Sequence, residues 1–429
     1  MIAAHPRQRG RVVVLTAFVC LFCTLPYWRA LLLPSISDTY LQVWLGRHYG
    51  HLSQLPELAA DALYRCRATS IWLTAITDSI FGFDQPILHI ESLLLHLLNV
   101  CLIAALGRGP HIGFQISIPA ALLWGLYERH HEAVIWYAAL PEQLVFFFVL
   151  LTVVLWVEWW QNGKALFYCA SLASFILALL SKESAVAACA LIALPLIFEP
   201  HRYRQLLRAA SPFFFLSLTY FAFNVIDRSS NLHWNDGTFR LGWHFLPVLF
   251  NSTARLFSFW GLAAIALLAY NRKIIEWRIV FFALAWIPIC LAPYAFIAYM
   301  PRVPSRHVYL ASLGVALLIS VAVQPLLHRR KTILALLALY LVSNTSYIWF
   351  YKHNQFMERA NVTEHLIRDA KLLSTANHPH ALQVSCFPLA PEIAVLALSY
   401  HLGLAESSIS VDKTVSPTCV EPQVQLVLD

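Results

Sequence analysis

Continuous apolar runs separated by short polar connections dominate the first 350 residues of the chain. Many of the runs approach the roughly 20 residues that a helix needs to cross about 30 Å of hydrocarbon. Because a bilayer offers no hydrogen-bond partner to open backbone, and because the runs do not alternate, we predict about 11 transmembrane helices rather than barrel strands. The predicted spans cover residues 12–33, 85–106, 114–127, 142–159, 165–180, 185–198, 211–226, 255–270, 279–298, 308–327 and 332–350.

The composition agrees with this pattern. Hydrophobic residues make up 59% of the 429 residues and charged residues 12%, whereas a soluble domain has about 45–50% apolar and about 25% charged residues. The chain is therefore interpreted as an all-α polytopic membrane protein. Its net charge of +7 implies no nucleic-acid partner, because in a membrane protein the placement of charge matters more than the total.

The placement of basic residues predicts an orientation. Arg7, Arg9 and Arg11 precede the first apolar run, which lacks a small-residue cleavage site and is interpreted as a retained helix. When the connections are assigned alternately to the two sides, the N-terminal side carries dense basic turns such as residues 328–331. We predict a cytoplasmic N-terminus and an extracytoplasmic C-terminus, and the compact length and small exported tail favour a bacterial inner membrane.

Residues 351–429 form a different kind of sequence, predicted to be a small α/β extracytoplasmic domain after a membrane domain of residues 1–350. A unit of about 80 residues is marginal alone, so we expect it to lean on the membrane domain. Cys386 and Cys419 are the cysteines of this polar segment, and a disulfide between them is one possibility. Its predicted elements are a helix at 354–373, a strand at 381–388, a helix at 391–402 and a closing strand at 423–428.

The polar interval at residues 35–84, between the first two spans, is a candidate site. Its first ionisable residue is Asp38, and Tyr64 and Arg65 come further on, in a chain poor in charge. A solvated loop is the plainer alternative. Ionisable groups at a membrane are costly and tend to face a cavity or a partner.

Three further polar clusters fall on the same predicted side, at residues 128–132 with Glu142 shortly after, 181–183 and 302–307. Together they suggest a polar chamber that opens outward. A carboxylate there can act as a general base, and Arg or Lys can hold a phosphate. His130 and His131, next to Glu132, lack a third ligand at a defined spacing, and no cysteine pair suits zinc, so a divalent metal stays possible but is not supported.

Six motifs occur in order along the chain: Tyr64-Arg65, Phe81-Gly82-Phe83-Asp84, His89 with Leu93 to Asn99, His130 to Trp136, Leu180-Ser181-Lys182-Glu183 and Arg306 to Gly314. The motifs and their order resemble those of polyprenyl-phosphate-sugar-dependent membrane glycosyltransferases of the GT-C fold, and in particular the membrane domain of mannosyltransferase-like proteins that carry tetratricopeptide repeats. No period of about 34 residues follows the last span, so the repeats are absent. The sequence departs from the family pattern in four places: Cys66 follows Tyr-Arg where the family has Pro, Ser92 replaces Asn, a basic residue is missing before Glu142, and Asp38 lacks a second carboxylate beside it.

The resemblance implies an inverting transferase that moves a sugar from a polyprenyl-phosphate-linked donor to a lipid, polysaccharide or protein acceptor on the extracytoplasmic side. It implies that Asp38 is the catalytic base. Two alternatives stay open: a lipid-carrier-binding or transport protein, and a degenerate transferase that acts as an assembly partner. The substrate-binding residues that it implies are Tyr64, Arg65, His130, Glu132, Lys182, Glu183 and Arg306.

Overall fold

The computed structural model describes residues 6–377, 381–412 and 422–427. Within these residues, six helices are long and apolar enough to cross a membrane, and five shorter apolar helices accompany them. The predicted all-helical polytopic membrane architecture is thus confirmed. The long helices are Gln85–Arg108, Tyr137–Asn162, Pro200–Ser230, Phe245–Tyr270, Trp277–Phe296 and Arg330–Ser374, and the short ones are Gly10–Thr24, Phe114–Gly125, Ala165–Leu179, Glu183–Ile197 and Ser312–Leu326.

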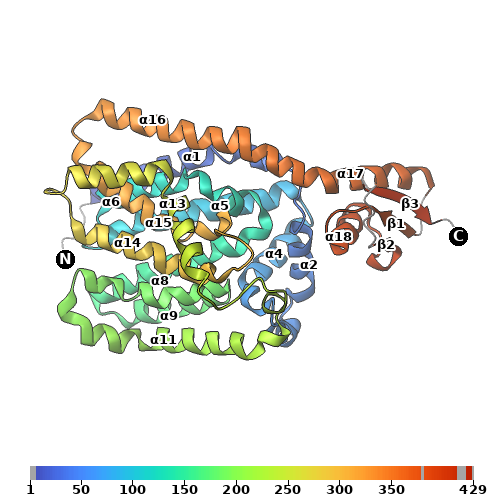
Figure 1. Ribbon diagram of the computed structural model, residues 1–429, viewed down its shortest axis with the longest axis horizontal. Coiled ribbons are helices and arrows are strands. Elements are labelled where there is room, and N and C mark those ends of the chain that lie inside the picture. Colours follow the sequence, from blue (N-terminus) through green and yellow to red (C-terminus); the bar gives the residue numbers. More distant parts are fainter. Residues whose placement is uncertain (1–5, 378–380, 413–421, 428–429) are drawn as a thin grey trace.

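The membrane helices lie side by side along the long axis of the molecule (Figure 1). Helix α15 (Ser312–Val323) is apolar all round and buried on nearly every side, as expected for a helix at the centre of a bundle. Trp124, Trp156 and Trp286 are the largest fully buried side chains of the surrounding core. The other bundle helices are α1 (Pro6–Thr24), α5 (Gln85–Ala105), α6 (Phe114–Gly125), α8 (Leu140–Asn162), α9 (Ala165–Leu179), α11 (Tyr203–Ile226), α13 (Phe245–Tyr270), α14 (Trp277–Leu291) and α16 (Arg330–Ser346).

The interval at 35–84 is not the loop that its polar composition predicts. It folds into α2 (Thr39–Tyr49), α3 (Leu55–Ala60) and α4 (Ala68–Phe81). These helices form because each has one apolar side to bury; Val43, Leu45 and Ile71, for example, have almost no exposed surface.

Three predicted spans also need correction. The first helix ends at Thr24 rather than 33, because Pro26 interrupts it, and a short 3-10 turn, Trp28–Leu32, follows. The predicted span at 185–198 is a series of 3-10 turns around α10 (Ala188–Leu191) instead of a regular helix. Helix α13 begins at Phe245, earlier than the predicted 255.

The last membrane helix continues without interruption into the C-terminal unit. Helix α16 passes through a π-helical turn, Tyr347–Lys352, into α17 (His353–Asn377). Figure 1 shows this continuous element in orange along one edge of the bundle. The predicted domain boundary after residue 350 therefore falls inside a helix.

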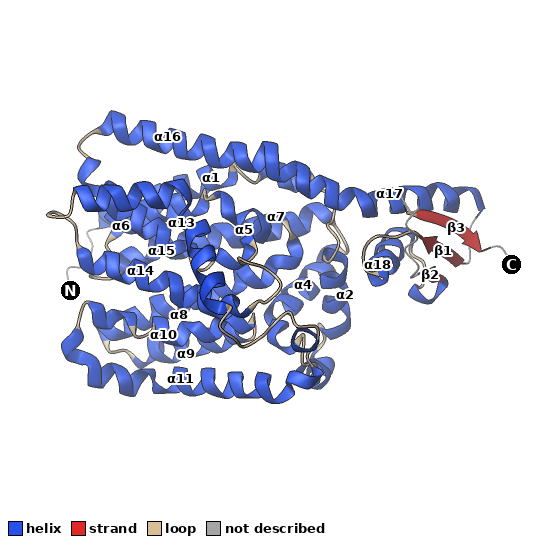
Figure 2. Ribbon diagram, viewed as in Figure 1, coloured by secondary structure: helices blue, strands red, loops and turns tan. Residues whose placement is uncertain are grey.

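The C-terminal unit is the predicted small α/β structure. Strand β1 (Ala381–Ser385) pairs parallel with β2 (Ile409–Val411) and antiparallel with β3 (Gln423–Val427), and α18 (Pro391–Leu402) packs nearby (Figure 2). Strand β2 was not predicted. Cys386 is disulfide-bonded, whereas Cys419 lies outside the described residues.

The C-terminal unit leans on the membrane domain, as expected from its small size. Its apolar core includes Leu382 and Val384 of β1 and also Tyr40 of α2. Helices α2 and α4 lie at the same end of the bundle as this unit (Figure 1).

Candidate functional site

Asp38 lies at the start of α2, where its side chain makes no capping hydrogen bond. The preceding residue, Ser37, has a positive φ of 33°, a left-handed conformation that is uncommon for a residue other than glycine. The positive charges of Arg306, Arg67 and Arg359 are near enough to stabilise the ionised Asp38 carboxylate. Within the described chain, however, that carboxylate makes no hydrogen bond and no ion pair within 4.0 Å. Asp38 is thus a charged group among cations, with no direct partner.

Burial changes the acidity of this carboxyl group. Desolvation raises the pKa of Asp38 above its ordinary value of 3.8, and the three arginines offset only part of that rise. A carboxylate with a raised pKa is a better proton acceptor than an ordinary surface aspartate.

Arg67 is a site residue that the sequence did not single out. Arg67 is the last residue of the 3-10 turn Arg65–Arg67. Its guanidinium carbon lies 5.9 Å from the centre of the Tyr64 ring. Its Nε is buried and finds no hydrogen-bond partner among the described residues. The available signal was a second arginine two residues after Arg65, directly before the apolar helix α4. Tyr64 itself is half-buried, and burial raises its pKa.

Arg65, in contrast, already has a partner. Its Nη1 lies 2.6 Å from Oδ2 of Asp227, which follows the end of α11. Only 19% of the Arg65 side chain is exposed. This ion pair ties the turn that carries Arg65 to α11, so the structure supports a bracing role for Arg65 rather than the implied contact with substrate.

Glu142, near the start of α8, is the centre of a buried polar cluster. It accepts a hydrogen bond from Lys182, and its Oε1 lies 2.5 Å from Nδ1 of His307. The Tyr294 hydroxyl donates to the other carboxylate oxygen at 2.5 Å and lies 2.7 Å from Oγ of Ser184. The Glu142 side chain is only 3% exposed. Three elements far apart in sequence are thereby joined at one carboxylate.

The cluster fixes the charge state of its members. Burial lowers the pKa of Lys182, and Glu142 opposes that shift. Burial also lowers the pKa of His307, to about 3, and Lys182 adds to the effect, so His307 is neutral near pH 7. Lys182 therefore has its charge balanced by Glu142 before any ligand binds.

Glu132 holds the backbone of the neighbouring segment. Its Oε2 accepts a hydrogen bond of 3.0 Å from the backbone N–H of Arg306 and lies 3.7 Å from Nη1 of the same residue. Burial alone would raise the pKa of Glu132, but the charge of Arg306, the nearby His131 and the hydrogen bond from the Arg306 backbone together lower it. The guanidinium of Arg306 also lies 5.0 Å from the ring of Trp136. Glu132 is thus bonded to Arg306, and the adjacent His307 is linked through Glu142 to Lys182. The charge of Arg306 acts on the Asp38 carboxylate without direct contact, and these residues together are called the Asp38 network.

His130 does not join this network. It has no exposed surface, its Nε2 lies 2.7 Å from Oγ of Ser312, and it packs against Trp124 and Tyr309 at 4.5 and 4.7 Å. The structure therefore places His130 in the aromatic core, without the access to a ligand that the resemblance implies. The polar sequence around it hid this packing.

The remaining candidates are simpler. Glu183 begins the 3-10 turn next to Lys182 and makes no side-chain hydrogen bond or ion pair within the part of the chain that is described. Asp61 accepts hydrogen bonds from the Tyr49 hydroxyl and from the backbone of Leu63 and Tyr64, so it shapes the turn. No group of three His, Cys, Asp or Glu side chains that could hold a metal ion occurs among the described residues.

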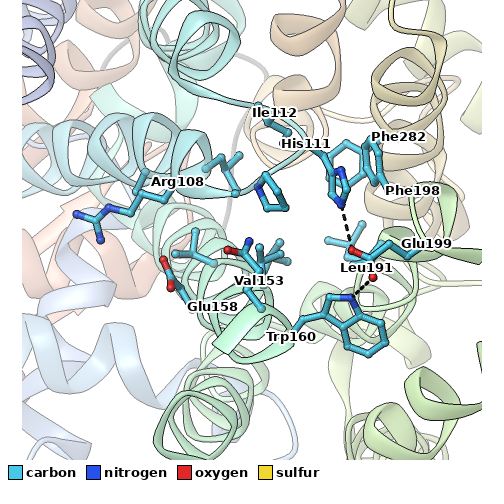
Figure 3. A pocket seen from close by; sticks show the side chains of 18 residues that line it. Arg108, His111, Ile112, Val153, Glu158, Trp160, Leu191, Phe198, Glu199 and Phe282 are labelled. Carbon is cyan, nitrogen blue, oxygen red and sulfur yellow. Dashed lines mark hydrogen bonds and ion pairs between the residues drawn. The ribbon is translucent and has the colours of Figure 1, made fainter. Parts of the chain in front are cut away.

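Two cavities lie at the end of the bundle opposite to Asp38 and Glu142. One, of about 60 Å³, is lined by residues that include Arg108, Trp160 and Glu199; the Trp160 indole and His111 both hydrogen-bond to Glu199 (Figure 3). The other is an apolar groove of about 510 Å³ between α5 and α8. Because α8 carries Glu142 at its first turn and Trp160 at its last, both cavities are remote from the Asp38 network.

No model of a known protein family and no curated protein matches the sequence. Among solved structures, the crystal structure of ArnT from Cupriavidus metallidurans bound to undecaprenyl phosphate is similar, with a TM-score of 0.46 and 14% identity. The alignment covers 92% of this chain and 76% of that chain. A likeness this low carries no argument about activity, which has to be inferred from the residues themselves.

Proposed function

We propose that this chain is a membrane glycosyltransferase of the GT-C kind. It transfers a sugar from a polyprenyl-phosphate-linked donor to an acceptor hydroxyl at the membrane surface next to Asp38. The order of motifs from Asp38 to Gly314 supports the type of enzyme, and the arrangement around Asp38 supports the chemistry.

In the reaction, the acceptor hydroxyl attacks the anomeric carbon while the bond from that carbon to the lipid phosphate breaks. A single displacement from the opposite face inverts the configuration. Asp38 takes the acceptor proton, and the departing phosphate retains the bonding electrons and gains negative charge. The reaction therefore needs one carboxylate and several cations, separated by the reacting atoms.

The unpartnered carboxylate of Asp38 is the observation that carries the proposal. A buried structural carboxylate is normally paired, because an isolated charge is costly away from water. Asp38 instead faces three arginines beyond ion-pair distance, which leaves the carboxylate and the cations available to different groups of a substrate. We assign the lipid phosphate to Arg67 and Arg306. Glu142 contacts both Lys182 and His307, so it neutralises Lys182 and holds the segment that carries Arg306.

The test uses the full chain in nanodiscs with polyprenyl phosphate mannose and polyprenyl phosphate glucose as donors. A membrane extract supplies acceptors, and the release of polyprenyl phosphate is measured. Loss of a general base costs about 10²–10⁴-fold in rate, so Asp38→Asn should lower release by at least about 100-fold.

Asp84→Asn is the matched control. Asp84 is exposed and caps α5 through the backbone N–H of Ile87, a role that Asn also fills. Equal activity in Asp38→Asn and the wild type would reject the base assignment. Tight binding of the lipid without any release by the wild type would favour the alternative of a lipid-carrier-binding protein.

A further inference from the structure

Arg359 reaches the candidate site from the C-terminal helix α17. Its guanidinium carbon lies 5.9 Å from the centre of the Trp136 ring, and that of Arg306 lies 5.0 Å from the same ring. Arg359 is also one of the three cations that act on Asp38. One indole ring thus has two positive charges beside it, one from the membrane domain and one from the helix that leads into the C-terminal unit.

Neither of these two guanidinium groups has an ion-pair contact shorter than 3.7 Å in the described parts of the chain, and the Asp38 carboxylate acts on both from beyond 4.0 Å. Arg359 forms no ion pair within 4.0 Å in the described parts of the chain. Glu132 approaches Arg306 only to 3.7 Å, because its nearer contact is to the Arg306 backbone. The indole N–H of Trp136 is buried and has no hydrogen-bond partner among the described residues. Two guanidinium groups and a free N–H donor suit an anion with several oxygen atoms, such as a phosphate.

The C-terminal unit holds Arg359 in this place. Near the start of α17, Phe356 packs on His131 at 6.0 Å between ring centres. Further along the helix, Leu366 and Ile367 belong to the same apolar core as Tyr40, two residues after Asp38. The unit therefore contacts both the helix that carries Arg359 and the helix that carries Asp38.

A second contact fixes the unit to α2 and α4. The ring of Tyr400 in α18 lies 5.4 Å from that of Phe83, and the guanidinium of Arg47 lies 4.3 Å from the Tyr400 ring. Arg47 is itself paired with Asp78 through two hydrogen bonds of 2.8 Å. Movement of the C-terminal unit would thus displace Arg359 relative to Asp38.

We propose that Arg359 completes the donor site: together with Arg306 and the Trp136 N–H, it holds the phosphate of the lipid carrier. This inference rests on the proposed function. It makes the C-terminal unit part of the site, so the membrane helices alone form an incomplete one. Arg359 is a binding residue for the phosphate and takes no part in proton transfer.

Binding of undecaprenyl phosphate, the lipid present in the ArnT structure, tests this inference without any need for turnover. The full chain is placed in phosphatidylcholine nanodiscs and titrated with the lipid. Arg359→Gln should weaken binding about tenfold, as expected for the loss of one charge-assisted contact. Arg359→Lys should restore most of the affinity. Arg368→Gln is the matched control, since Arg368 lies on the same helix, is 64% exposed and pairs only with its neighbour Asp369.

The outcomes separate this inference from the proposed function. Unchanged affinity in Arg359→Gln overturns the role of Arg359, whatever Asp38→Asn does to turnover. Weakened affinity in Arg359→Gln together with full turnover in Asp38→Asn keeps the phosphate site and rejects the proposed base. Equal competition by phosphatidylglycerol also overturns the inference, because the cations would then bind any anionic lipid. A purely structural role for Arg359 predicts equal losses in the Gln and Lys variants.

Discussion

The cluster around Glu142 provides the sharpest test of how the membrane domain holds the candidate site. Glu142→Gln keeps the size of the side chain and removes its charge. Lys182, whose side chain is only 15% exposed, then has no counter-ion. The oxygen of residue 142 that contacts Nδ1 of His307 is then no longer charged. Removal of one partner of a buried ion pair costs about 3–5 kcal/mol, mainly because the other charge stays buried. We expect Glu142→Gln to lower the free energy of unfolding by about that amount.

The double variant Glu142→Gln/Lys182→Met separates the charge effect from simple loss of contacts. It removes both charges, so no ion is left uncompensated, and it should be less destabilised than Glu142→Gln alone. The free energy of unfolding is measured by denaturant titration in detergent micelles, with tryptophan fluorescence as the signal.

Glu158→Gln is the control on the same helix, because the Glu158 side chain hydrogen-bonds only to Asn162 among the described residues and the change should shift the free energy by no more than about 0.5 kcal/mol. The reasoning is refuted if Glu142→Gln is no more costly than Glu158→Gln. It is also refuted if the double variant loses as much as the two single variants added together, since that would mean no coupling between the two charges.

Three further predictions concern the surroundings of the cluster. Turnover requires ionised Asp38, so it should fall with decreasing pH through a value above 3.8, as recorded in a pH–rate profile; an acid limb at or below 3.8 contradicts the raised pKa. Asp227→Asn breaks the partly exposed pair with Arg65 and should cost about 1 kcal/mol in unfolding titrations while leaving affinity for undecaprenyl phosphate unchanged; a large loss of affinity would make Arg65 a substrate contact after all. Tyr400→Ala removes the ring beneath Arg47, so proteolysis between α18 and β2 should accelerate, and an unchanged rate would argue against docking through this ring.

The parts of the fold that follow from local pattern were predictable. Continuous apolar runs specify helices in a membrane because no other open structure satisfies the backbone there. The helices α2 to α4 escaped prediction because their polar residues were conspicuous, while the apolar side that they bury, with Val43 and Ile71, was spread through the same interval. The apolar run continues past Pro26 to residue 33, which hides the early end of the first helix, although proline commonly interrupts a helix.

The candidate site was only partly predictable, for a different reason. Glu132 contacts Arg306, and Lys182 is linked through Glu142 to the neighbouring His307, while Asp38 has no direct contact with any of them. Whether a charged residue is free or paired depends, however, on partners remote in sequence. Arg65 is paired by Asp227, and Glu142 gathers three donors from separate elements. Those partners are visible only in three dimensions.

Arg359 likewise could not be assigned to the site from the sequence. In sequence it is one of several charges on a polar helix, far from every motif that indicated a transferase. Only the uninterrupted passage from α16 into α17 brings it to Trp136 and Arg306. No local pattern could have selected it over Arg368.

The most direct test of the account compares binding and turnover in Asp38→Asn. Undecaprenyl phosphate affinity and release of polyprenyl phosphate from the sugar-linked donor are measured on the same nanodisc preparation. We predict affinity at least equal to that of the wild type, because a negative charge near the phosphate is removed, and a loss of release of at least about 100-fold. Retained release, or loss of binding and release together, would contradict the role of Asp38 as the base.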